Sequence, residues 1–281
     1  MFSKLLKHEW KANAGLLWIL SACAVGVGLL GAGILRTITY LEAHMLNGQM
    51  AAIAISSLSS MMVFVVLALV AYALAVQFIN LWRFYKNKFT DEGYLTFTLP
   101  VNPHQIFLAS LLNILAWLVI SACVVLLSVL LMVFVGTSEQ VKEFFRAMVE
   151  MDQAMGDVDE IGLPGIGLFM CLSLVQIFVA PVYAIVLLMT SITLGCVLAK
   201  KHKILATIGM YYVINMVVNV ISSVLSVVPT IMMLGSMMEN MENYMYNLSL
   251  AVGLSLLMQI GLSIGGYFWS THLMKHKLNL P

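Results

Sequence analysis

Few side chains in this sequence are arranged for chemistry. The only hydrolase-like pattern is the G-x-S-x-G run Gly261-Leu262-Ser263-Ile264-Gly265. A serine nucleophile in that pattern needs a strained turn between a strand and a helix, together with a histidine base. Here the pattern lies inside a long apolar run that is typical of a continuous helix. We therefore predict that Ser263 is not a nucleophile and that the chain is not an enzyme.

Patterns that bind metals or nucleotides are weak as well. The sequence has no H-E-x-x-H run and no G-x-x-x-x-G-K-[ST] phosphate-binding run. Its four cysteines show no C-x-x-C spacing. Methionines cluster near the end of one apolar run, at Met232, Met233, Met237, Met238, Met241 and Met245. Such a cluster is compatible with copper(I), but a flexible lining for an amphipathic substrate is the better interpretation. We expect no metal and no cofactor on this chain.

Uncharged polar residues do occur inside the apolar runs, namely Gln77, Asn113, Gln176, Asn215, Asn219 and Gln259. Asn215 and Asn219 are four positions apart, so they share one face of a helix. Hydrogen bonding between packed membrane helices explains such residues most simply. The sharper alternative is that they line a substrate path, and our candidates for that path are Gln176, Asn215, Asn219 and Gln259.

Composition tells which elements must position these residues. Of the 281 residues, 62% are hydrophobic and only 10% are charged, whereas about a quarter of a soluble domain is charged. A helix needs about 20 apolar residues to cross the hydrocarbon core of a bilayer. Charge-free stretches of that length predict an all-α, polytopic membrane protein forming one transmembrane domain over 1–281. Its six spans are expected near 15–36, 53–80, 106–135, 166–199, 204–232 and 249–271.

Small residues and prolines indicate where these spans approach one another or bend. Glycines recur in the first span, at Gly26, Gly28, Gly31 and Gly33, and in the last span, at Gly261 and Gly265. They predict close packing between helices or between two subunits. Pro181 and Pro229 are candidate kinks, because a proline lacks the amide that its helical turn would use.

Orientation follows from the distribution of the basic residues. With six spans, both termini share a side with the loops 81–105 and 200–203. That side carries 11 of the 14 basic residues, whereas 10 of the 13 acids lie on the other side, mostly in the loop 136–163. We predict that both termini are cytoplasmic and that 136–163 is an outer loop. The near-zero net charge says nothing about nucleic acid, and we expect no nucleic-acid partner.

The first 14 residues read as a short amphipathic helix. Phe2, Leu5, Leu6 and Trp10 share one helical face, and Lys4, Lys7, His8 and Lys11 share the opposite one. Such a segment is typical of a helix that lies in the membrane interface. A helical positive flank of the first span is an equally good explanation.

The cytoplasmic loop 81–105 is too polar to enter lipid and too aromatic for a solvated linker. Thr90 is a suitable cap for a short helix, with Asp91 and Glu92 in its first turn. The aromatic and aliphatic residues that follow, up to Pro100, would form an apolar surface. Either this surface receives a partner, or it packs on the ends of its own spans.

A resemblance favours the partner. The run Phe-Thr-Asp-Glu-Gly-Tyr-Leu-Thr-Phe-Thr-Leu-Pro-Val at 89–101, followed by Gln105 and an apolar span, resembles the loop between the second and third spans of ABC exporter permeases of the second type. These are similar to the lantibiotic-immunity and multidrug permeases of Gram-positive bacteria. In that family the loop carries a coupling helix that docks into a separate ATPase subunit. The resemblance implies as docking residues Asp91, Glu92, Gly93, Tyr94, Leu95, Thr96, Phe97, Leu99 and Pro100.

The resemblance also implies the assembly. It predicts a multi-pass permease in a bacterial cell membrane, working with two ATPase subunits that hold ATP and magnesium and with a second permease, identical or homologous. Its cargo would be an amphipathic or hydrophobic peptide, lipid or drug. The alternatives to an exporter permease are a carrier or channel that works without ATP and a regulatory membrane subunit. No charged residue lies at the centre of a span, which weakens the case for an ion-coupled carrier.

Overall fold

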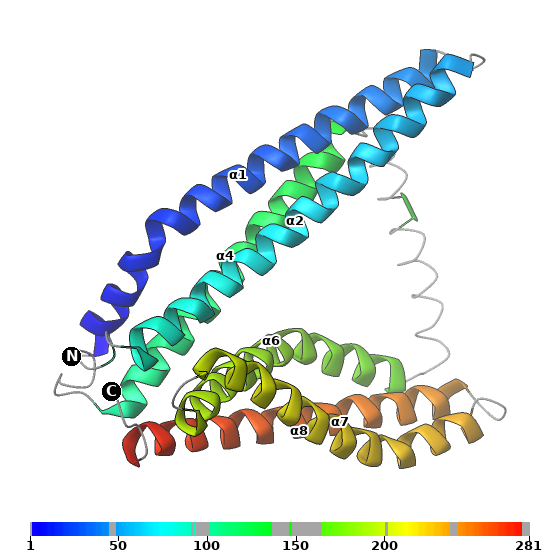
Figure 1. Cartoon of the computed structure of the whole chain (residues 1–281). Coiled ribbons are helices and arrows are strands. Elements are labelled where there is room, and N and C mark those ends of the chain that lie inside the picture. The colour runs from blue at the N-terminus through cyan, green and yellow to red at the C-terminus, as the bar shows by residue number, and fades with distance from the viewer. Residues whose placement is uncertain are drawn as a thin grey trace. The chain divides into compact units, whose positions relative to one another are not determined.

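The computed structural model of the protein describes residues 2–44, 49–90, 93, 102–136, 146–147, 164–199, 202–236 and 241–276. Over these ranges the ordered elements are helical, and six of the helices are long and apolar enough to cross a membrane. The six helices (Figure 1) are α1 (Phe2–His44), α2 (Gln49–Phe89), α4 (Pro103–Gly136), α6 (Pro164–Leu198), α7 (Lys203–Ser236) and α8 (Met241–His276). The all-α, multi-span prediction is confirmed at this level.

The helices are longer than the spans that the sequence predicted. The shortest of the six have 34 residues, whereas about 20 suffice to cross the hydrocarbon core. α1 runs unbroken from Phe2 to His44, so residues 2–14 continue directly into the first span without a separate helix. α6 and α7 also continue through Pro181 and Pro229.

The start of α4 shows why one helix extends beyond its predicted span. Pro103 is its first residue, a position where proline has no helical amide to lose. The carbonyl of Asn102 accepts hydrogen bonds from the amides of Gln105 and Ile106, at 2.9 and 3.3 Å. The helix therefore begins three residues before the expected 106.

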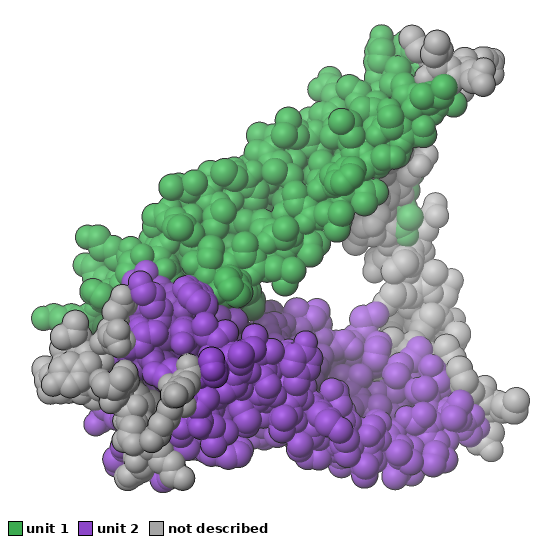
Figure 2. All heavy atoms as spheres, in the orientation of Figure 1, with its two compact units in different colours: residues 1–80, 112–156 green, residues 81–111, 157–281 purple. Residues whose placement is uncertain are grey.

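The chain divides into two compact units, coloured separately in Figure 2. Unit 1 comprises Met1–Asn80 and Leu112–Gly156, and unit 2 comprises Leu81–Leu111 and Asp157–Pro281. The divisions fall inside α2 and α4, so each of these helices contributes one part to each unit. Unit 1 holds α1 with the longer parts of α2 and α4, and unit 2 holds α6, α7 and α8.

The core of unit 1 forms where α1, α2 and α4 meet. Its buried members are Leu17, Ala24, Val65, Leu69, Tyr72, Val76, Trp117 and Met132. Trp117 of α4 is 1% exposed. Its ring stacks on that of Trp10, with centroids 5.0 Å apart, and meets Trp18 edge-on at 5.8 Å. Trp10, expected on the apolar face of an interfacial helix, thus packs against the protein itself.

Polar contacts and small residues join the same three helices. Asn13 donates from Nδ2 to Oδ1 of Asn80 at 3.0 Å, and the hydroxyls of Ser21 and Tyr72 are 2.8 Å apart. These hydrogen bonds are of the kind that holds membrane helices together. At Gly28, an added Cβ would stand 2.7 Å from the Ser128 Cβ. The close packing predicted for this glycine is therefore present.

In unit 2, α6, α7 and α8 contact one another pairwise. At the α6–α7 crossing, a Cβ on Gly195 would lie 2.5 Å from the Thr207 Cα. On α8 the close approach occurs at Gly266, where a Cβ would lie 2.9 Å from the Thr190 hydroxyl. Gly261 and Gly265, which the sequence singled out, meet nothing within 4 Å of an added Cβ in the described part of the chain.

Much of the remaining helical surface is apolar and exposed. Phe178 of α6 and Leu205 of α7, for example, are 75% and 69% exposed. Exposed apolar surface of this extent would be unfavourable in water. It suits helices whose surroundings are hydrocarbon, since their backbone hydrogen bonds are satisfied internally.

Candidate functional site

Most of the predicted docking residues lie outside the described part of the chain. These are Asp91, Glu92, Tyr94, Leu95, Thr96, Phe97, Leu99 and Pro100. Gly93 is described and buried, and its amide donates a hydrogen bond to the carbonyl of Thr90 at 2.8 Å. The coupling helix itself stays a prediction, as do the features placed on 137–145 and 148–163 of the outer loop.

Both ends of the 90–102 loop are nevertheless described, and both belong to unit 2. At the first end, Phe89 closes α2 and is 2% exposed. The ammonium group of Lys203 donates a hydrogen bond from Nζ to the Phe89 carbonyl at 3.0 Å. The last carbonyls of a helix have no amide partner within it. Lys203, the first residue of α7, thus supplies a hydrogen-bond donor to the last carbonyl of α2.

An aromatic cluster links this point to the second end of the loop. The Phe84 ring meets Phe89 edge-on at 5.6 Å and Phe107 at 6.1 Å. Phe107, in the second turn of α4, is fully buried, and its ring meets Tyr267 of α8 at 5.4 Å. Edge-to-face geometry at these separations is the favourable arrangement for aromatic rings.

The contacts at the two ends of the loop reach two later helices. Lys203 joins the first end to α7, and Phe107 joins the second end to α8 through Tyr267. We call the five residues Phe84, Phe89, Phe107, Lys203 and Tyr267 the loop base.

The sequence reasoning missed the loop base. From the sequence, Lys203 was considered only as one of the basic residues whose distribution predicts the orientation. Phe107 and Tyr267 read as ordinary apolar positions of two spans. The single available signal was the pair of phenylalanines Phe84 and Phe89 just before residue 90. This pair by itself does not indicate a contact with α7 or α8.

Asn215 and Asn219 lie on α7, as predicted, within a longer polar stripe. The stripe comprises Asn215, Asn219, Ser222, Ser226 and Thr230, whose spacing of four, three, four and four places them on one helical face. Asn219 lies near the middle of the candidate span Lys203–Ser236 and is exposed. Asn215 is half-buried and donates to the carbonyl of Tyr211 at 2.9 Å.

The other two path candidates pair with each other. Gln176 of α6 donates from Nε2 to Oε1 of Gln259 on α8, at 3.0 Å. The Oε1 atom of Gln176 is itself buried and has no hydrogen-bond partner among the described residues. The pair thus joins two helices of unit 2, as the simpler of the two sequence interpretations expected. The structure does not bring it together with Asn215 and Asn219 by any described hydrogen bond.

Ser263 and the methionine cluster can now be placed. Ser263 lies within α8, and its hydroxyl donates to the carbonyl of Gln259 at 2.7 Å. It occupies no strand-to-helix turn, in keeping with its predicted lack of a nucleophilic role.

Of the methionine cluster, Met232 lies near the end of α7 and is 51% exposed. Met237 and Met238 lie outside the described residues. Within the described ranges, no three His, Cys, Asp or Glu side chains are grouped so that they could hold a metal ion.

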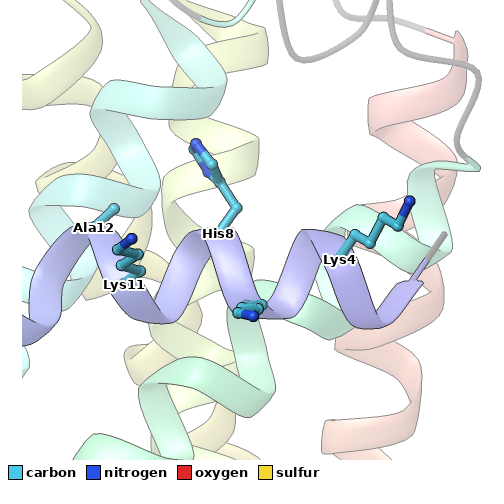
Figure 3. Close-up of a pocket in the computed structure, with 5 residues that line it drawn as sticks. Lys4, His8, Lys11 and Ala12 are labelled. Carbon is cyan, nitrogen blue, oxygen red and sulfur yellow. The ribbon is translucent and has the colours of Figure 1, made fainter.

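The basic face predicted for the N-terminal segment is present on α1. Lys4, Lys7, His8 and Lys11 are exposed, whereas Leu5 and Leu6 on the other face are half-buried. The four basic side chains and Ala12 line an open depression of about 410 Å³ on the helix (Figure 3). The exposed basic face is therefore present, whereas the opposite face also carries the buried Glu9.

Comparison with known proteins yields no relative: no protein-family model, curated protein or solved structure matches the chain.

Proposed function

We propose that the chain is the permease subunit of an ABC exporter that moves an amphipathic or hydrophobic substrate outward across a bacterial cell membrane. Two copies of a separate ATPase would bind ATP and magnesium on the cytoplasmic side. A second permease, identical or homologous, would complete the path. The proposal takes both termini and the 81–105 loop to be cytoplasmic, in accordance with the distribution of basic residues.

The observation that carries the proposal is the loop base. If ATP binding and hydrolysis move a coupling helix at 90–102, that motion must reach the spans that bound the substrate path. The Lys203–Phe89 hydrogen bond and the Phe107–Tyr267 contact give it a direct route into α7 and α8. An interfacial plug without a mechanical role would not need both ends of the loop tied to later helices.

The polar stripe on α7 supports the second permease. An exposed amide in the middle of a span is unfavourable in hydrocarbon, because nothing there can accept or donate a hydrogen bond. Asn219 is in this situation within the single chain. A second permease against α7 would supply partners for it. A polar path for an amphipathic substrate along the same seam would do so too.

The direct test is co-purification of the full chain with the products of its neighbouring genes, followed by measurement of ATP turnover. We expect an ATPase subunit to co-purify. Changing Tyr94→Asp or Phe97→Asp should break this association and abolish the turnover that depends on the permease, because a carboxylate in an apolar docking socket is costly to desolvate.

Asn102→Asp is the matched control. It adds the same charge near the loop, outside the docking residues, and keeps a side chain that caps α4 well. It should leave association and turnover intact. The proposal is wrong if no ATPase co-purifies and the Tyr94 and Phe97 variants behave like the control. Transport driven by an ion gradient in liposomes without ATP would instead establish a carrier.

A further inference from the structure

A second open pocket lies in unit 2, at the start of α4 and the end of α8. Its volume is about 470 Å³, and it is lined by His104, Phe268, Trp269, Thr271, His272 and Lys275. Phe268 and Trp269 are 60% and 57% exposed. The Thr271 hydroxyl already donates to carbonyls of its own helix. The other lining residues contribute two imidazoles, one ammonium group and two aromatic rings.

Helical spacing and one ring contact bring these groups together. Phe268, Trp269, His272 and Lys275 follow one another at intervals of one, three and three residues, so they share a face of α8. His104 is the second residue of α4. Its ring lies 5.9 Å from that of Tyr267, next to this face. The pocket is therefore formed by residues of two helices rather than by a row of side chains on one helix.

The charge of the pocket has one sign. Lys275 carries a positive charge, the imidazoles of His104 and His272 can donate hydrogen bonds, and no carboxylate is among the lining residues in the part of the chain that the structure describes. The N-terminus of α4 also points its positive dipole end toward this region, because His104 belongs to the first turn. Such a combination suits an anionic group such as a phosphate.

The position along the helices indicates the source of the phosphate. The candidate spans that contain the pocket begin at Pro103 and end at Lys275. The pocket thus lies where a span leaves the hydrocarbon, which is the depth of phospholipid headgroups. The exposed rings of Phe268 and Trp269 stand one turn deeper along α8, toward the acyl chains. A free anion would not need this apolar side.

We propose that this pocket binds an anionic membrane phospholipid, with the phosphate held by His104, His272 and Lys275 and the glycerol and upper acyl chains against Phe268 and Trp269. The site is independent of the proposed ATPase partner. Basic pockets between membrane helices are a known form of headgroup recognition. The volume also lies in the range of ligand-sized pockets rather than of single-ion sites.

The test is native mass spectrometry of the full chain purified in detergent. The chain is titrated with phosphatidylglycerol, or with phosphatidylcholine of the same acyl chains. We expect one phosphatidylglycerol to bind more tightly than the rest, and no such preference for phosphatidylcholine. The double variant His104→Gln with Lys275→Gln should weaken this binding about fivefold or more, as expected for loss of a cation near a headgroup.

The control double variant is His202→Gln with Lys86→Gln. It removes the same residue types and the same charge at exposed positions outside the pocket. It should bind phosphatidylglycerol like the unaltered chain. Equal weakening in both double variants, or in neither, overturns the proposal. So does full displacement of the lipid by inorganic phosphate, which would make the pocket a site for free anions.

Discussion

Lys203 Nζ donates a hydrogen bond to the carbonyl oxygen of Phe89 at 3.0 Å, across 114 positions of sequence. Lys203 begins α7 and Phe89 ends α2. The lysine therefore does at a distance what a C-terminal capping group does locally, since it satisfies a carbonyl that its own helix leaves unpaired. The start of the 90–102 loop is tied to α7 by this bond.

Removing that bond should loosen the end of α2. Lys203→Met keeps the length of the side chain but deletes the donor. A hydrogen bond from a charged group contributes about 1.5 kcal/mol or more, so we expect amide exchange in 86–93 to rise by about tenfold. Hydrogen exchange with mass spectrometry measures this. Lys11→Met, on an exposed face of α1, is the control and should leave 86–93 unchanged; equal exchange in both variants would contradict the role of Lys203.

The Gly195–Thr207 contact predicts opposite effects for the same substitution at two glycines. Alanine is the better helix former by about 1 kcal/mol. Gly209→Ala should therefore be neutral or stabilising, because no described atom lies within 4 Å of its added Cβ. Gly195→Ala should lower the free energy of unfolding by about 2 kcal/mol, because its Cβ would meet the Thr207 backbone. Unfolding in detergent and denaturant compares the two variants. A Gly195→Ala variant as stable as Gly209→Ala would show that α6 and α7 do not cross this closely.

The Gln176–Gln259 pair should behave as a coupled unit in a double-mutant cycle. Either single change to leucine leaves a half-buried amide without its partner, at a cost of about 1 kcal/mol. The double change removes both amides and should be close to neutral, with a coupling of about 0.6 kcal/mol or more. Strictly additive stabilities would mean that the bond contributes nothing. Loss of transport in a double variant of normal stability would place the pair on the substrate path instead.

Substitution of Asn219 should affect the association of two permeases rather than the folding of one. Because it is exposed within one chain, Asn219→Leu should leave the stability of the monomer unchanged or slightly raised. If a second permease pairs with the polar stripe, the same variant should weaken the permease–permease complex about three- to tenfold, the range for one hydrogen bond between membrane helices. Cross-linking in membranes or single-molecule counting measures the complex. Met216→Leu, on an exposed neighbouring face of α7, should have no effect, and a loss of association in both variants would remove the special role of the stripe.

Particular elements show how far sequence reasoning reached. The six spans were found because gaps between charged residues are a local signal that needs no knowledge of neighbours. Most of their ends were placed too far inside the helices. At the start of α4, for example, Asn102 and Pro103 are as typical of the end of a loop as of the first turn of a helix. Gly28 was correctly associated with close packing, whereas Gly266 rather than Gly261 or Gly265 makes the close approach on α8. All three glycines look alike in sequence, and only the facing helix distinguishes them.

The sequence by itself determined that this chain has six segments long and apolar enough to cross a membrane as helices, because a charge in hydrocarbon is costly wherever the rest of the protein lies. It also determined the exposed basic face of the first turns of α1. The tertiary structure decided which helix faces meet, and hence that Lys203 reaches Phe89, that Phe107 meets Tyr267, and that His104 shares a pocket with Lys275. These contacts join residues more than 100 positions apart, and no local pattern fixes the packing that brings them together.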